Sequence, residues 1–344
     1  MTPTGRNGER PPGLFLDRTG RPRALWRLVL QYLTFRVTTV VVANLALAGW
    51  LLTRPGGGAG PGLAGISGSP TLPLLSGVSG LVAALLSVYL ATRLLDRRRM
   101  RDLGLRLDHG WWLDLAFGMA LGAGLMTAIF GAELALGWVS VGGTLETAGT
   151  DAPFVLAGLF PVATYLCVGF YEELMHRGYG LTNAAEGLRG IFGSRAAVLL
   201  AWILSSAFFG YLHAQNPNAT LLSTLNISLA GILLGFGYVL TGQLAIPIGL
   251  HLTWNFFQGA VYGFPVSGLE PFGATLIATR QGGPDLWTGG PFGPEAGLIS
   301  PVAMLLGMLL IALYTRLRTG KANLHLPIAE GPIPNPSDSR EQQQ

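Results

Sequence analysis

The sequence has few charged residues for its length. Only 12% of its 344 residues are Asp, Glu, Lys or Arg, whereas 50% are hydrophobic. Ordinary soluble domains are roughly 25% charged, so the composition argues against average soluble domains and indicates a chain whose solvent is lipid. The net charge of +4 is not accompanied by interleaved aromatic and basic residues, and we expect no nucleic-acid partner.

Cysteine is nearly absent too. The single residue, Cys167, excludes an intrachain disulfide and leaves the redox compartment open. Its simplest interpretation is a small buried apolar side chain rather than a nucleophile. No cleavable signal peptide is evident, because the Arg-rich start leads into an apolar run that is too long for a signal sequence.

What the sequence does have is a series of long apolar stretches. A helix needs about 20 apolar residues to cross a bilayer. Eight stretches come close to this length, at about 25–52, 75–95, 111–138, 153–185, 196–213, 219–240, 243–262 and 300–317. The sequence therefore predicts an all-α polytopic membrane protein with about eight transmembrane helices.

The arginines predict how the chain is oriented. They gather before the first apolar stretch, in the 96–108 and 189–195 loops and after the last stretch. With an even number of crossings these segments fall on one side, and basic loops are usually cytoplasmic. We expect a multi-pass protein of the cell membrane, surrounded by lipid, with both termini in the cytoplasm.

Charged residues inside an apolar stretch are costly and usually functional. The fourth stretch contains Glu172, Glu173 and Arg177. On a helix Glu173 and Arg177 are four residues apart and pair, which leaves Glu172, about 100° further round, as a free acid–base group. The alternative is a charged helix end at the cytoplasmic surface, which the apolar residues before Arg189 disfavour.

Two further polar groups lie on later stretches. His213 ends the fifth stretch, four residues after Phe209, and by itself is more typical of an interfacial residue. His251 and Asn255 share one face of the seventh stretch and could donate hydrogen bonds to an oxyanion, although helix–helix hydrogen bonding is an alternative for Asn255. Glu172 and His213 stand at a similar distance from the same basic loop, which favours their convergence within the bilayer.

The order Glu-Glu-x-x-x-Arg, Phe-x-x-x-His and His-x-x-x-Asn on successive apolar stretches resembles the CAAX-protease and bacteriocin-processing (CPBP, Abi) family of intramembrane glutamic endopeptidases. The motifs are Glu172-Glu173…Arg177, Phe209…His213 and His251…Asn255, and the glycine-rich 231–235 run also fits. Each motif alone is weak, but three in order are fairly specific.

The resemblance implies a role for each matching residue. Glu172 and His213 would activate a water molecule, His251 and Asn255 would stabilise the oxyanion, and Glu173 with Arg177 would support the site. No cofactor is implied by this mechanism. Zinc bound by Glu172, His213 and His251 is a minority alternative, and the sequence lacks the His-Glu-x-x-His pattern of helical zinc sites.

The expected organisation follows from these assignments. It is a disordered cytoplasmic N-terminus (1–23), three transmembrane helices (24–150), a CPBP/Abi-like catalytic core of four helices (151–265), a Gly/Pro-rich loop (266–299), a last transmembrane helix (300–320) and a disordered tail (321–344).

The predicted function is hydrolysis of a peptide bond in a membrane-associated or lipid-anchored peptide or protein. Two alternatives stay open. One is a non-catalytic immunity or scaffold protein that binds a peptide in the same cavity. The other is a proton-coupled transporter, which the absence of an inverted repeat disfavours.

Overall fold

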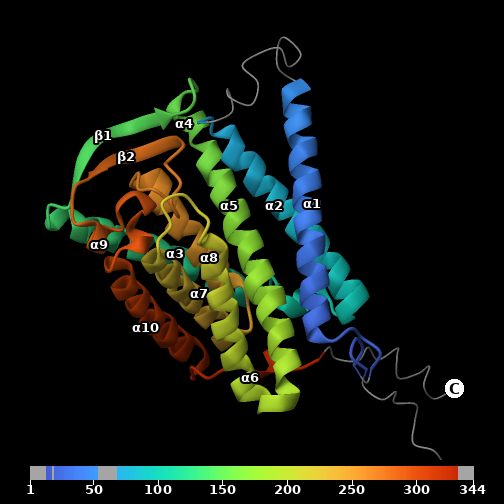
Figure 1. Ribbon diagram of the computed structural model, residues 1–344. Coiled ribbons are helices and arrows are strands. Elements are labelled where there is room, and N and C mark those ends of the chain that lie inside the picture. Colours follow the sequence, from blue (N-terminus) through green and yellow to red (C-terminus); the bar gives the residue numbers. More distant parts are fainter. Residues whose placement is uncertain (1–12, 18, 53–67, 332–344) are drawn as a thin grey trace, which may run out of the picture.

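A computed structural model describes residues 13–17, 19–52 and 68–331, which form a mostly helical bundle (Figure 1). The chain is a polytopic helical membrane protein, as predicted. The long helices are α1 (Ala24–Leu52), α2 (Thr71–Ala91), α3 (His109–Ala135), α5 (Leu159–Glu173), α6 (Thr182–His213), α7 (Leu221–Thr241), α8 (Ala245–Phe256) and α10 (Ile299–Thr319). The short helical segments are η2 (Thr92–Asp96), η3 (Met100–Leu103), α4 (Phe154–Ala157), η4 (Leu174–Leu181), η5 (Phe257–Val261), α9 (Asp285–Thr288), η6 (Gly290–Phe292), η7 (Pro294–Ala296) and η8 (Leu326–Ala329).

The number of membrane-spanning helices differs from the prediction. Within the described residues, six helical segments are long and apolar enough to cross a bilayer. One of them, Phe154–His213, contains two predicted stretches, and the chain passes from one to the other through a kink at the non-helical Gly193. The predicted 243–262 stretch forms α8 and the π-helix η5, with 12 and 5 residues, and it is shorter than the usual span of about 20 residues.

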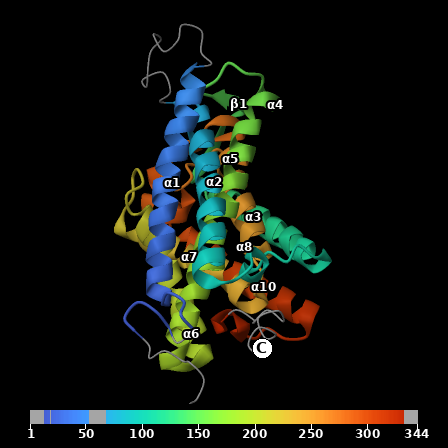
Figure 2. The same ribbon diagram turned by 90° about the vertical axis from the view of Figure 1, so that its right-hand side faces the viewer.

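Close helix packing places α8, the helix that bears His251. Figures 1 and 2 show α8 within the bundle, with α3 on its outer side and α1 and α2 along another side of the bundle. A Cβ atom added at Gly118 or Gly122 of α3 would lie 2.4 Å from the carbonyl oxygen of Ile246 or Leu250 on α8. Small residues let membrane helices approach this closely, so larger side chains here would push α8 away.

A small sheet lies at the end of the bundle away from the arginines. Strands β1 (Val139–Ala148) and β2 (Gly273–Gln281) pair antiparallel, with Val139 opposite Gln281 and Ala148 opposite Gly273. The expected 266–299 loop therefore contains the strand β2, and β1 lies between the third and fourth apolar stretches. The sequence separation of the two strands hid this pairing, because each strand alone is a short, Gly- and Thr-containing segment without strict alternation.

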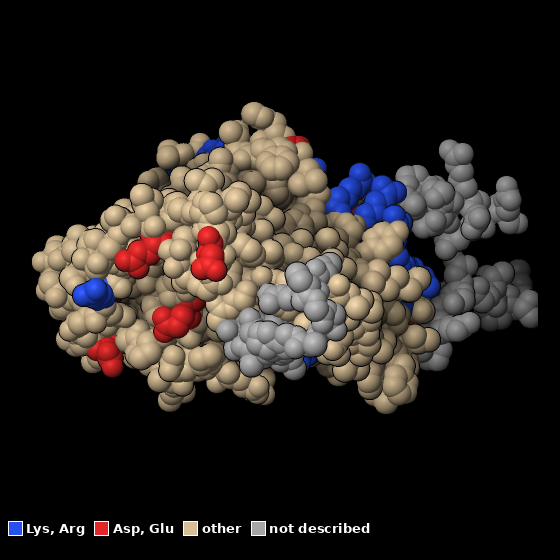
Figure 3. Space-filling view, turned by 90° about the horizontal axis from the view of Figure 1, so that it is seen from above, with Lys and Arg blue, Asp and Glu red and all other residues tan. Residues whose placement is uncertain are grey.

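Acidic side chains mark the same end of the molecule, which Figure 3 shows face on. Its exposed carboxylates belong to Glu146, Asp151, Glu270 and Asp285, and Arg280 is an exposed cation among them.

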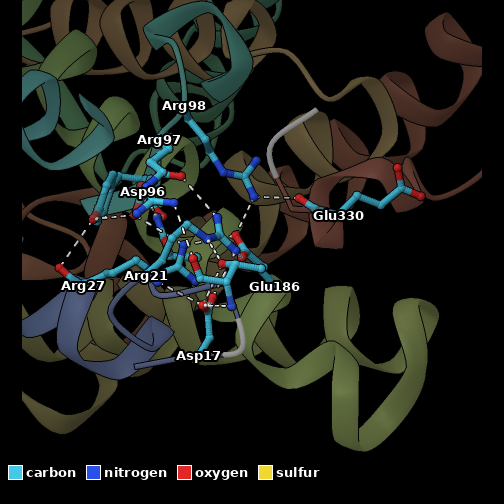
Figure 4. A network of polar contacts seen from close by, with 11 residues as sticks. Asp17, Arg21, Arg27, Asp96, Arg97, Arg98, Glu186 and Glu330 are labelled. Carbon is cyan, nitrogen blue, oxygen red and sulfur yellow. Dashed lines mark hydrogen bonds and ion pairs between the residues drawn. The ribbon is translucent and has the colours of Figure 1, made fainter. Parts of the chain in front are cut away.

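An ion-pair network closes the opposite, arginine-rich end (Figure 4). Buried Arg27 of α1 contacts Asp96 Oδ1 at 3.3 Å and Glu186 Oε2 at 3.1 Å. Arg21 and Arg98 reach the same Glu186 carboxylate at 2.5 and 2.6 Å. The network therefore ties the first helix to the end of η2 and the start of α6.

This network corrects part of the predicted disorder at the two termini. Arg21 is only 8% exposed, and Leu16 forms a β-bridge with Pro22, so the described part of 1–23 is folded against the bundle. At the other terminus Ile328 and Ala329 of η8 are buried, and Glu330 accepts a hydrogen bond from Arg98. Residues 1–12, 18 and 332–344 of these two segments lie outside the described residues.

Candidate active site

A cavity of about 620 Å³ lies inside the bundle, and we call it the central cavity. Its walls come from α1, α2, α5, η4, α6, α7, α8 and α10 and from connections after α6 and α8 and before α10. The four side chains with predicted catalytic roles all line it: Glu172, His213, His251 and Asn255. The fold thus brings Glu172 and Asn255, which are 83 residues apart in the sequence, to the same cavity.

Glu172 lies near the end of α5, where the α-helix changes into the π-helix η4. Such π-segments are frequent at functional sites because they rotate neighbouring side chains out of α-helical register. The Glu172 Oε1 atom accepts a 3.3 Å hydrogen bond from the Tyr171 hydroxyl. Its Oε2 atom is buried and without a hydrogen-bond partner among the described residues, while the Glu172 side chain as a whole lines the central cavity.

Glu173, in contrast, is fully buried and has two charged or ionisable partners, although its Oε2 atom, like that of Glu172, has no hydrogen-bond partner among the described residues. Its Oε1 atom accepts hydrogen bonds of 2.8 Å from Arg177 Nη1 and 2.8 Å from His251 Nδ1. The predicted i, i+4 pair of Glu173 and Arg177 is therefore present, and both residues lie behind the cavity wall rather than on it. The two neighbouring glutamates thus have different surroundings.

Arg177 is fixed from three sides. Besides Glu173, its guanidinium donates a 3.2 Å hydrogen bond to the Gly231 carbonyl of α7. It also lies 4.5 Å above the ring of Phe209, a cation–π arrangement. Arg177 therefore connects α7 and α6 to the glutamate pair, and the Phe209 of the predicted Phe-x-x-x-His motif contributes to packing.

The hydrogen bond to Glu173 also defines the protonation of His251. A carboxylate accepts, so Nδ1 of His251 carries the hydrogen. Its Nε2 atom lies 3.9 Å from Glu172 Oε2, beyond hydrogen-bond distance. A neutral His251 would present a lone pair there, so it donates to an oxyanion only as the imidazolium, a form that the Glu173 carboxylate stabilises.

His213 is oriented by its own helix. Its Nδ1 atom lies 2.8 Å from the carbonyl oxygen of Phe209, which can only accept, so Nδ1 carries the hydrogen. In the neutral ring Nε2 is then a proton acceptor. The position at the end of α6 suggested an interfacial residue, whereas the structure places this imidazole at the central cavity with Glu172.

Sequence reasoning missed two charged residues of the central cavity, Arg36 and Glu295. Arg36 lies within α1, on the first apolar stretch. Glu295 lies in the Gly/Pro-rich connection before α10 and is only 5% exposed. Burial raises the pKa of the Glu295 carboxyl, although hydrogen bonds from Ser267 oppose this. Neither residue belongs to a recognisable motif.

A metal site was the minority prediction. Among residues 13–17, 19–52 and 68–331, no group of three or more His, Cys, Asp or Glu side chains has an arrangement that could hold a metal ion. The Nδ1 atom of His251 is also engaged by Glu173.

Comparison with known proteins gives one match. Residues 154–257 match the family model described as type II CAAX prenyl endopeptidase Rce1-like. The matched segment runs from α4 through α8, and it includes every residue of the three motifs. No curated protein and no solved structure matched the chain.

Proposed function

Because residues 154–257 are an Rce1-like domain of the CAAX-protease family in a membrane-spanning chain, we propose that this protein is an intramembrane endopeptidase. Its substrate is a membrane-associated or lipid-anchored peptide or protein, and it hydrolyses a peptide bond with water activated by Glu172 and His213.

One observation carries this proposal. The unpartnered Glu172 Oε2 atom and the imidazole of His213 share one cavity, while the neighbouring Glu173 is occupied by Arg177 and His251. A general base must be unoccupied and within reach of the water that it deprotonates. Glu172 meets the first condition, and the cavity provides room for the water and the peptide.

The reaction then uses the four cavity residues in turn. Glu172 takes a proton from water as the water oxygen attacks the peptide carbonyl carbon. Asn255 and protonated His251 donate hydrogen bonds to the resulting oxyanion. The C–N bond breaks as the nitrogen receives this proton, either directly from Glu172 or after its transfer to Nε2 of His213, which gives a carboxylic acid and an amine without a covalent enzyme intermediate.

We also propose that both termini lie in the cytoplasm, on the side of the Arg27 ion-pair network. The supporting observation is the charge asymmetry between the two ends of the bundle: arginines gather at one end, and four exposed carboxylates stand at the other. Single cysteines at Asp151 and Lys321 in a Cys167→Ser background test this. Impermeant maleimide should label the first in intact cells and the second only after permeabilisation, and the opposite pattern would reverse the orientation.

The activity is tested by cleavage of membrane-anchored peptides by purified protein in detergent. Glu172→Gln should abolish cleavage, whereas Glu270→Gln, the same change at an exposed site, should leave it unchanged. A zinc chelator forms a separate arm. Loss of activity on chelation and its return with zinc would replace the glutamate mechanism by a metal mechanism, and full activity of Glu172→Gln would overturn the site assignment.

A further inference from the structure

A second carboxylate faces the central cavity from the wall opposite α1 and α2, and neither the motifs nor the family assignment gives it a role. This residue is Glu295 of η7, the short helix before α10. Figure 1 shows α1 and α2 on one side of α5, and α7 and α10 on the other. Because η7 packs against α7 and α10, Glu295 reaches the cavity from their side, whereas the aromatic residues Tyr32 and Phe35 reach it from α1.

The backbone on both sides of Glu295 is held by side chains of other helices. The Pro294 carbonyl accepts a 2.6 Å hydrogen bond from Ser300. The Gly297 carbonyl accepts a 3.0 Å bond from buried Asn226 of α7. These bonds fix the position of the carboxylate, as a recognition group requires.

The charge of Glu295 has no partner of opposite sign within this part of the protein. Its Oε2 atom accepts hydrogen bonds from Ser267 N at 2.7 Å and Ser267 Oγ at 2.9 Å. Among the residues that the structure describes, no Lys, Arg or His nitrogen lies within ion-pair distance of it. The titratable groups that interact with it electrostatically are His213, His251 and Tyr165, which come from α6, α8 and α5.

A buried carboxylate without a cation is unfavourable, and buried charges are normally paired. Two Ser267 hydrogen bonds orient Glu295 but supply no positive charge. The carboxylate also lines a cavity that is large enough for a peptide segment. The missing partner is thus a positive charge that enters with a ligand.

We infer that Glu295 binds a cationic group of the substrate, a Lys or Arg side chain or a free amino group near the scissile bond. This inference rests on the proposed function and narrows its substrate class. The peptide carries an apolar portion, which fits the Tyr32 and Phe35 side of the cavity, and a basic residue, which reaches the Ser267 and Glu295 side. Glu295 is accordingly a specificity residue, and Glu172 remains the general base.

The test measures binding in the full-length, inactive Glu172→Gln protein, so that it does not depend on turnover. The probes are fluorescent, N-acylated peptides in which one Lys is moved along the chain, each matched by a norleucine peptide of similar shape. At one position Lys should bind about tenfold more tightly than norleucine, the discrimination expected of one charge-assisted hydrogen bond.

Adding Glu295→Gln should remove this preference while the norleucine peptide binds as before, which shows that the variant is folded. Adding Glu270→Gln instead should keep the preference for Lys over norleucine. This control makes the same change at an exposed carboxylate three residues after Ser267. The inference is overturned if no position favours Lys, if neither peptide binds, if the preference survives Glu295→Gln, or if both peptides lose affinity equally, as a purely structural role predicts.

Cleavage of the same peptides by the wild-type protein separates this inference from the proposed function. If the protein prefers the Lys peptide in binding but cleaves none of the peptides, the endopeptidase assignment is wrong and the cation site stands. Equal cleavage of Lys and norleucine peptides, unaffected by Glu295→Gln, would remove the cation site and leave the endopeptidase.

Discussion

The replacement of Arg177 by methionine tests the buried ion pair with Glu173, an interaction that the neighbouring Glu172 does not make. Arg177 and Glu173 are 1% and 0% exposed, and Arg177 also holds the Gly231 carbonyl and the Phe209 ring. Removing one member of a buried ion pair leaves the other charge uncompensated, at a cost of roughly 3–5 kcal/mol. Since His251 still contacts Glu173, we expect the lower part of this range.

The corresponding change in thermal stability is measurable. For domains of ordinary size each kcal/mol shifts the Tm by about 2–4 °C, and the shift is smaller in longer chains. With about 2 °C per kcal/mol and a cost of roughly 3–4 kcal/mol, we expect Arg177→Met to lower the Tm by roughly 6–8 °C. Tryptophan fluorescence of the purified protein during heating in detergent provides the assay.

A matched control and a double variant complete this experiment. Arg316→Met makes the same substitution at an exposed position of α10, where we expect a change of no more than about 1 °C. Combining Arg177→Met with Glu173→Leu should restore part of the lost stability, because no unpaired carboxylate remains. If Arg177→Met melts within about 1 °C of the wild type, the ion pair does not stabilise the site and the reasoning fails.

Three further predictions address the surroundings of the site. Gly80→Ala places a Cβ atom 2.8 Å from the Tyr171 ring and so displaces the hydroxyl that donates a hydrogen bond to Glu172. We expect kcat to fall about tenfold, which corresponds to about 1.4 kcal/mol. Gly124→Ala is the control, because its Cβ atom meets nothing within 4 Å, and it should leave kcat unchanged. Burial raises the pKa of Glu295 above its ordinary 4.5. The folded state therefore binds this proton more tightly than the unfolded state, and the stability of the wild type decreases as pH rises above 4.5. Glu295→Gln should raise the Tm more at pH 7.5 than at pH 5, and an equal shift at both pH values would contradict this. Burial, and next the positive charge of Arg106, lower the pKa of His325 below 6.5. The contribution of neutral His325 to the stability of the fold is therefore complete above pH 6.5 and is lost as pH falls below it. The Tm difference between the wild type and His325→Gln should shrink from pH 7.5 to pH 5.5, and a constant difference would count against this.

Local spacing was enough to predict much of the site. Long apolar stretches become helices in lipid because each backbone amide must bond within its own segment. The i, i+4 separation of Glu173 and Arg177 brings them together on any helix, and the same holds for the shared face of His251 and Asn255. The similar distance of Glu172 and His213 from one basic loop also correctly anticipated that both reach the same cavity.

Other features depend on segments that are distant in sequence. Glu172 and Glu173 are chemically identical neighbours, and the contact of His251 with one of them makes the difference. Two interactions join segments that are more than 100 residues apart. They are the pairing of β1 with β2 and the ion pair of Arg21 with Glu186. Neither pairing leaves a periodic pattern in the sequence.

The sequence by itself determined the membrane solvent, the helices and the three polar motifs of the candidate site, since these follow from hydrophobicity and from spacing along one helix. The tertiary structure alone decided that His251 contacts Glu173 through its Nδ1 atom, and that Glu295 from a Gly/Pro-rich connection forms part of the cavity wall. The physical reason is that a side chain's charge state and partners depend on the helices and connections packed around it, which lie far away in sequence.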